Sequence, residues 1–315
     1  MLEAIAGDVM GSNYEYDPIK TKYFELLGAD CFFTDDTVMT IAVADSLMNG
    51  RDYVETLQMW PQKYLGAGYG GWFNKWIYED FPEPYNSFGN GSAMRSSSVG
   101  WLFDDEEAVL KEAEKSTEIT HNHPEGIKGT QAVALGVLMG RKGCSKKEIR
   151  EKLETGFGYD LSQKLEQIRP NYRFDVTCQG SVPQAIIAFL ESTDFEDAIR
   201  NSISLGGDAD TQACITGALT EAHYKNIPDE IEVDVKDFVI GDSIKISDAV
   251  MPEGARPAID DRDFTLATVA APRIIIEDEP AEGEEGAEAS AEEGGEGEGA
   301  AKEGSDDVKP EEAKD

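Results

Sequence analysis

The sequence predicts an all-α fold for most of the chain. Apolar residues recur at helical spacing from residue 34 to about residue 226, and strand signals are few in this region. Residues 34–48 and 208–224 have no wide polar face, which is typical of helices buried nearly all round. Each of these two segments begins with two aspartates and a threonine. We therefore expect an all-helical domain built around two buried central helices whose starts are acidic.

The first acidic start lies in "CFFTDDTVMT", where Thr34, Asp35 and Asp36 precede a long apolar run. Thr34 or Asp35 would make a good N-cap, and acids in a first turn interact favourably with the helix dipole. Two ionised carboxylates at a buried helix start also repel each other and need partners or a cation. Taken alone, the motif favours capping and metal binding about equally.

The second acidic start lies in "LGGDADTQA", where Asp208, Asp210 and Thr211 open the other apolar helix. If the two starts meet, the carboxylates and hydroxyls of both motifs converge. Such a cage of hard oxygen atoms suits Mg²⁺, Mn²⁺ or Ca²⁺ and offers zinc neither sulfur nor imidazole. We therefore favour a site for two metal ions over two unrelated helix caps.

Several further helices are predicted between these motifs. Ser145 stands three residues before Glu148, a capping-box pattern, and that helix closes near Gly156 or Gly158. Other helices are predicted over residues 124–143, from Pro183 in a helix-entry position, and over residues 194–207.

The pattern of apolar residues changes after Pro228. Residues 229–276 contain alternating apolar positions and β-branched runs, which predict a small β-rich segment. Residues 277–315 contain 17 acids, three lysines and no aromatic residue, so this segment cannot bury enough apolar surface to fold. We predict a helical domain over residues 1–228, the β-rich segment and a disordered acidic tail that is mainly solubilising.

Composition excludes several classes of function. The formal charge is −35, of which −21 lies in residues 1–276, and this disfavours binding to nucleic acid or to acidic membranes. The four cysteines are scattered and resemble reduced thiols. No basic leader and no apolar run of about 18 residues is present. We expect a cytoplasmic protein.

Five motifs in residues 1–228 carry a family resemblance. They are "GDVMGSNYE", "FFTDDTVMT", "SFGNGSAMR", "THNHPEGIKG" and "LGGDADTQA". In this order they resemble the ADP-ribosylglycohydrolase family, which includes the dinitrogenase-reductase-activating glycohydrolase. The resemblance implies a compact helical domain with two divalent cations, usually Mg²⁺ or Mn²⁺, in a central cleft.

The same resemblance assigns residues to the site. Glu15 matches a glutamate implicated in catalysis, and Asp35 and Asp36 are assigned a catalytic role besides metal binding. The implied metal ligands are Thr34, Asp35, Asp36, Asp208, Asp210 and Thr211. The implied substrate-binding residues are Phe88, Asn90, Gly91, Ser92 and His121, whereas Met94 and Arg95 are expected to pack and tether the glycine-rich loop.

The chain after about residue 229 resembles a different family, the general-stress form of the bacterial ribosomal protein that binds 5S rRNA. Only the C-terminal domain and acidic tail of that family have counterparts here. A natural fusion and an accidental chimera are both consistent with the sequence. Ribosome association through this segment is an alternative that the sequence does not favour.

The activity implied is hydrolysis of the bond between ADP-ribose and a protein side chain or a small acceptor. The substrate would then be an ADP-ribosylated protein or a small ADP-ribose conjugate. Two alternatives stay open, an inactive relative that acts as a binding protein and a dimetal phosphohydrolase. Arginine, serine and small-molecule linkages are not distinguished by the motifs.

Overall fold

The structure is a computed structural model that describes residues 1–225, 232–233, 243–250, 263 and 265–268. Residues 1–225 form an all-helical body, as predicted. Its helices are α1 (Leu2–Ser12), α2 (Asp35–Asn49), α3 (Tyr53–Lys63), α4 (Gly71–Trp76), α5 (Gly91–Met94), α6 (Ser97–Leu102), α7 (Glu106–Glu118), α8 (Pro124–Arg141), α9 (Lys146–Phe157), α10 (Leu165–Ile168), α11 (Cys178–Glu191), α12 (Phe195–Ile203) and α13 (Ala209–Tyr224).

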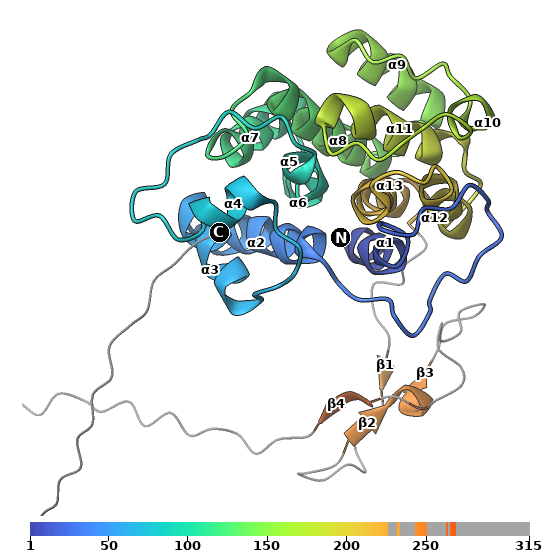
Figure 1. Cartoon of the computed structure of the whole chain (residues 1–315), viewed down its shortest axis with the longest axis horizontal. Helices are drawn as coiled ribbons and strands as arrows, with labels where there is room; N and C mark the ends of the chain where they lie inside the picture. Colours follow the sequence, from blue (N-terminus) through green and yellow to red (C-terminus); the bar gives the residue numbers. More distant parts are fainter. Residues whose placement is uncertain (226–231, 234–242, 251–262, 264, 269–315) are drawn as a thin grey trace, which may run out of the picture. The chain divides into compact units, whose positions relative to one another are not determined.

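Helix α13 is the centre of this body (Figure 1). It packs against α1, α8, α11 and α12. Every residue of α13 from Ala209 to Thr220 is buried, so this helix is surrounded on all sides as the sequence predicts.

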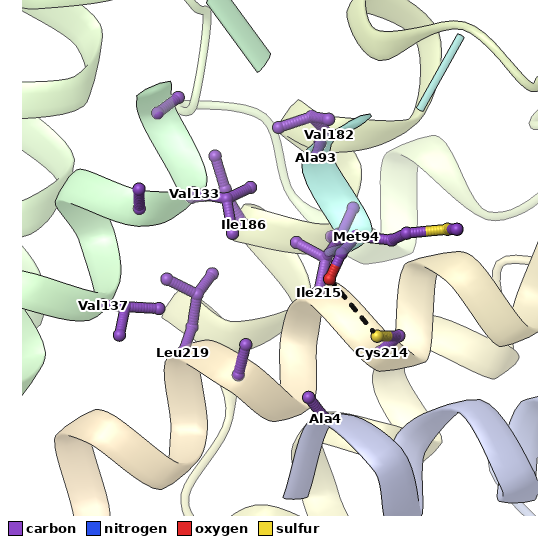
Figure 2. Packing of buried hydrophobic residues seen from close by; sticks show 14 of the residues in the cluster. Ala4, Ala93, Met94, Val133, Val137, Val182, Ile186, Cys214, Ile215 and Leu219 are labelled. Carbon is purple, nitrogen blue, oxygen red and sulfur yellow. Dashed lines mark hydrogen bonds between the residues drawn. The ribbon is translucent and has the colours of Figure 1, made fainter. Parts of the chain in front are cut away.

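The core beside α13 is formed by aliphatic side chains of three helices. Ile215 and Leu219 of α13 lie near Val133 of α8 and Ile186 of α11 (Figure 2). The thiol of Cys214 is directed toward the carbonyl oxygen of Met94, 3.6 Å away. This contact connects α13 to the short helix α5, which follows the glycine-rich loop.

Helices α1 and α13 approach each other unusually closely because glycines stand at their contact. A Cβ atom on Gly7 would lie 2.1 Å from the carbonyl oxygen of Ala213, and one on Gly217 would lie 2.1 Å from that of Glu3. Real Cβ atoms do not come so near to backbone oxygen, so no larger residue fits without moving the helices apart. The sequence analysis assigned no helix to residues 2–12.

Helix α2 is less buried than predicted. Its N-cap is Thr34, whose Oγ1 accepts a hydrogen bond from the Asp36 N–H at 3.2 Å. One side packs against α3 and another against α6, but the last turn reaches the surface, where Met48 is 69% exposed. The prediction of a helix buried nearly all round is therefore wrong for the C-terminal end of α2.

Several predicted helix ends are confirmed and one is corrected. Ser145 and Glu148 form the expected capping box, and Gly158 ends α9 with a φ of 67°. Helix α11, however, begins five residues before Pro183, because Thr177 accepts a hydrogen bond from the N–H of Gly180 and caps the helix earlier. Pro183 therefore lies inside the helix rather than at its entry.

The described residues after 225 form two short antiparallel pairs. Strand β1 (Glu232–Val233) pairs with β3 (Ala249–Val250), and β2 (Ser243–Lys245) pairs with β4 (Thr265–Thr268). Within the segment predicted to be β-rich, Ile246 begins the short 3₁₀ helix η1 (Ile246–Asp248). The boundary at residues 228–229 and the tail at 277–315 lie outside the described residues and stay predictions.

Within the parts of the chain that the structure describes, no helix combines the length and the apolar character that crossing a membrane requires.

The contact between α1 and α13 can be tested with Gly7→Ala. Because the added Cβ would overlap a backbone carbonyl, we expect a loss of about 1–3 kcal/mol in the free energy of unfolding, measured by urea denaturation. The control is Gly156→Ala, on the exposed side of α9 with nothing within 4 Å. That change should be neutral or slightly stabilising. Equal effects of the two substitutions would contradict the close approach.

Candidate functional site

A cleft of about 330 Å³ lies at the starts of α2 and α13. Its volume is at the small end of the range for ligand pockets. Most of the residues predicted for the site line it, namely Glu15, Asp35, Asp36, Asn90, Gly91, His121, Asp208, Asp210 and Thr211.

The two acidic helix starts meet in the structure. Thr211, in the first turn of α13, donates a hydrogen bond from Oγ1 to Oδ2 of Asp36 at 3.1 Å. Thr34 both caps α2 and lies 3.5 Å from the same carboxylate oxygen. Helix capping and convergence of the two acidic motifs are thus both present at the start of α2.

Asp8 of α1 lies at the same place and was not identified from the sequence. Its buried carboxylate accepts hydrogen bonds from Thr34 N (2.9 Å) and Oγ1 (2.7 Å) and from Thr37 N (3.1 Å) and Oγ1. The available signal was an acid inside the otherwise small and apolar run "AIAGDVMGS". Asp8 fixes the start of α2 and adds a buried carboxylate next to Asp36 and Asp210, which line the cleft.

The carboxylates form two overlapping groups of three. Oxygen atoms of Asp8, Asp36 and Asp210 lie within 4.8 Å of one another, and so do those of Glu15, Asp208 and Asp210. Asp210 belongs to both groups. Carboxylate oxygens at such separations are suitable ligands for Mg²⁺, Mn²⁺ or Ca²⁺.

The surroundings of Asp36 fit a bound cation. Its Oδ1 atom is buried and has no hydrogen-bond partner among the described residues. The charges that act most strongly on it are those of other aspartates, Asp210 first and Asp8 next. Because buried charges without compensation are costly, positive charge at this position would stabilise the folded protein.

Burial and mutual repulsion raise the pKa values in the cleft. Desolvation, followed by repulsion from Asp210, raises the pKa of Asp35 to about 8 and that of Glu15 to about 7. The pKa values of Asp36 and Asp208 are raised for the same two reasons. Desolvation also raises the pKa of Asp8, although its hydrogen bonds to threonine oppose the shift.

Asp35 takes a different position from the other aspartates. Its N–H donates to the carbonyl oxygen of Ala67 at 2.6 Å, and its side chain lines the cleft. Asp35 belongs to neither of the two carboxylate groups, although it was predicted as a metal ligand. One carboxylate oxygen of Asp35 lies beside Gly68, in the loop before α4.

The glycine-rich loop is tied to the acidic groups by Asn90. The Asn90 amide donates to Oδ2 of Asp208 at 2.7 Å and to Oγ of Ser181 at 3.1 Å, and its N–H donates to the carbonyl oxygen of Val176 at 2.8 Å. Gly91 follows as the first residue of α5. The loop and the start of α13 therefore hold a fixed position relative to each other.

Two predicted substrate-binding residues do not line the cleft. Ser92 is fully buried, and its hydroxyl bonds to the carbonyl oxygens of Gly89 and Gly126, so it supports the loop from behind. Phe88 is 43% exposed and packs edge-on against His123 at a centroid distance of 5.2 Å. His123 itself caps α8, because its side chain accepts a hydrogen bond from the N–H of Glu125.

His121 lines the cleft as a neutral donor. Arg95 donates to Oγ1 of Thr120 at 2.8 Å, and this hydroxyl lies 2.7 Å from Nδ1 of His121. If Thr120 donates to Nδ1, the ring carries its proton on Nε2. Burial and the nearby Arg95 charge hold the pKa of His121 well below its usual value. Arg95 is itself buried in the cleft wall.

Aromatic residues that the sequence analysis did not select complete the wall of the cleft. Trp72 of α4 is 69% exposed and stacks on Tyr85, and Phe174 is half exposed. Exposed aromatic faces at a cleft are typical of ligand contacts.

Fold and site together define a class, that of all-helical proteins with an acidic cleft at two helix starts. The ADP-ribosylglycohydrolase family model matches residues 2–255, and the chain belongs to this family. The fold and the family expected from the five motifs are therefore confirmed.

Individual proteins agree with this assignment. ADP-ribosylhydrolase ARH3 of Mus musculus is 27% identical over 301 residues, which cover 70% of this chain and 81% of that protein. A solved structure described as an ADP-ribosylglycohydrolase-related protein complex matches with a TM-score of 0.57 and 25% identity, covering 72% of this chain and 87% of that one.

A second similarity agrees with the ribosomal resemblance. Large ribosomal subunit protein bL25 of Brucella abortus (strain S19) is 53% identical over 57 residues. These residues cover 18% of this chain and 28% of the ribosomal protein.

The raised pKa values predict how stability depends on pH and on cations. A carboxyl group whose pKa is raised by folding stabilises the fold at low pH and loses that contribution as the pH rises through its folded-state value. Without metal, the melting temperature should therefore decrease as the pH rises from about 4 to about 8, the range over which Asp35 and Glu15 lose their protons. Added Mg²⁺ or Mn²⁺ should raise it more at pH 8 than at pH 5, since ligation needs ionised carboxylates.

This dependence can be measured by thermal unfolding with chelator and with each cation. The Asp36→Asn variant should show a smaller cation effect at pH 8. A cation effect that is absent, or equal at both pH values, would show that these carboxylates do not form a cation site.

Proposed function

We propose that the chain is a divalent-cation-dependent hydrolase that cleaves the glycosidic bond between ADP-ribose and a protein side chain or small acceptor. The observation that carries the proposal is the pair of carboxylate groups sharing Asp210 in the wall of a ligand-sized cleft. Family membership and the similarity to the mouse relative, an ADP-ribosylhydrolase, support it.

Two cations, Mg²⁺ or Mn²⁺, would be held by the two carboxylate groups. Thr34 and Thr211 lie beside Asp36 and would add hydroxyl oxygens. Asp35 lies farther from these groups and would act on the substrate side of the cleft. When bound, such cations supply positive charge for the sugar hydroxyls and lower the pKa of water.

The bond broken joins C1 of the ribose to the nitrogen or oxygen of the acceptor. Water adds its hydroxyl group to C1, its proton goes to the acceptor, and positive charge develops on the ribose in the transition state. Glu15 would orient the water, take up its proton and pass it to the acceptor, because Glu15 lines the cleft beside Asp208 and Asp210. The surrounding carboxylates would stabilise the charge that develops on the sugar.

The nucleotide end of the substrate would lie against the glycine-rich loop. Gly89 and Gly91 leave backbone atoms accessible, and Nε2 of His121, which lies beside both glycines, offers a proton donor. Donors of this kind suit a diphosphate. Asn90 would act mainly by holding this loop on Asp208.

The proposal is tested by release of free ADP-ribose from arginine-linked, serine-linked and small-molecule conjugates, with Mg²⁺ or Mn²⁺ and with chelator. Asp210→Asn removes the ligand shared by both groups and should lower kcat/KM by more than about 100-fold, since loss of outer partners alone costs 10–100-fold. Asp17→Asn, in the exposed loop beyond Glu15, is the matched control and should keep the parent rate.

The products distinguish the alternatives. Inorganic phosphate or AMP in place of ADP-ribose would indicate a phosphohydrolase. Tight ADP-ribose binding without turnover, by protein that binds cations, would indicate a binding protein. If the Asp210→Asn variant hydrolysed the conjugates as fast as the parent chain, the shared carboxylate would have no part in hydrolysis.

A cytoplasmic location and an ADP-ribosylated partner protein are part of this proposal. Ribosome association is not, because the similarity to bL25 covers only 28% of that protein.

A further inference from the structure

A surface hollow of about 800 Å³ is lined by basic side chains although the chain carries a net charge of −35. The lining consists of Lys20, Lys22, Arg169 and Arg200, together with Thr21, Tyr23 and Phe24, and among the residues that the structure describes no acidic side chain lines it. We call these four cations, with the neighbouring Arg173, the basic hollow.

Three of these cations have no acidic partner among the described residues. Lys22 pairs with Asp197 and Arg200 pairs with Glu196. Lys20, Arg169 and Arg173 form no such ion pair within that part of the chain. Burial and then the charges of Arg173 and Arg169 lower the pKa of Lys20, so these like charges act on one another. An anion in the hollow would relieve this repulsion.

Hydrogen bonds to neighbouring segments hold the basic side chains in place. Lys20 donates to the carbonyl oxygen of Tyr172 at 2.8 Å and also to that of Leu205. Arg169 donates from Nε to Oγ of Ser204 at 3.0 Å. The cluster is therefore ordered before any ligand binds, which lowers the entropic cost of binding.

The basic hollow adjoins the cleft through two segments. Arg173 stands between Tyr172, whose carbonyl binds Lys20, and Phe174, which lines the cleft. Leu205, whose carbonyl also binds Lys20, is three residues before Asp208 of the carboxylate groups. A polypeptide with its modified residue in the cleft would pass close to these cations.

We propose that the basic hollow docks a carboxylate-rich stretch of the ADP-ribosylated protein, so that substrates with acidic residues near the modified side chain are preferred. This inference rests on the proposed function. The positive charges come from separate side chains on three segments, not from converging backbone amides. This arrangement suits several carboxylates spread along a chain better than a single phosphate.

The electrostatics of the whole molecule support a local role for these cations. An acidic polypeptide is repelled by most of a chain of charge −35, and repulsion beyond about 10 Å is largely screened at 0.1 M salt. A small positive surface next to the cleft therefore determines whether such a substrate can approach.

The test compares two ADP-ribosylated peptides that differ only in their flanks, one rich in glutamate and one with glutamine at the same positions. With the parent chain and Mg²⁺, the glutamate peptide should have the lower KM. Arg173→Gln combined with Arg169→Gln should raise that KM about three- to thirtyfold, with kcat and the glutamine peptide unchanged. Lys147→Gln, an exposed cation of α9, is the matched control and should leave the preference intact.

Arg169 also binds Ser204, so Arg173→Gln alone is the second variant. The Arg173 side chain is exposed and bonds only to the neighbouring Tyr172 carbonyl among the described residues, so this variant should fold normally. Equal KM values for the two peptides in the parent chain, or an unchanged preference in both variants, would overturn the proposal.

A binding measurement separates this proposal from the hydrolase itself. A fluorescent glutamate-rich peptide without ADP-ribose should bind the full chain at low salt, and its affinity should fall as the salt concentration rises. The Arg173→Gln variant should bind this peptide more weakly, whereas the Lys147→Gln variant should bind it as tightly as the parent chain. This result would support the basic hollow even if no conjugate were hydrolysed. Binding of polyphosphate but not of the peptide would overturn it in favour of a phosphate ligand.

Discussion

The close approach of α1 and α13 is the contact on which the candidate site depends. Glycine at positions 7 and 217 lets the two helix backbones touch, and Asp8 is the next residue along α1. Its carboxylate then meets the first turn of α2 through Thr34 and Thr37. A wider separation of these helices would move Asp8 away from its partners. The carboxylates of Asp8, Asp36 and Asp210 would then no longer lie together.

The same packing brings buried carboxylates together, and their desolvation and mutual repulsion destabilise the fold when they are ionised. Asp36 and Asp208 are brought into a water-poor interior with mainly like charges nearby, and their raised pKa values express this. A fold selected for stability alone would replace such groups with apolar ones. A cation offsets the repulsion only when the carboxylates are ionised, which couples the stability of the helical body to its ligand.

Charge is distributed unevenly over the part of the chain that the structure describes. Acidic side chains gather in the cleft, where Asn90 and His121 present uncharged donors opposite them. Basic side chains gather in the neighbouring hollow, and Lys20 connects it by hydrogen bonds to the segments before Phe174 and Asp208. The cleft is therefore a region of negative potential and the adjoining hollow a region of positive potential.

The helical fold, the buried character of α13 and the expectation that the two acidic helix starts meet could be predicted from the sequence alone, because helical period, capping and uncompensated charge are local signals. The structure was needed to show that Asp8 joins these helix starts, that Asp35 belongs to neither carboxylate group, and that the hydroxyl of Ser92 supports its loop from within the fold. It also assembled the basic hollow from three separate segments. These features depend on how close two helices come and which way a first-turn side chain points, and packing against distant residues sets both.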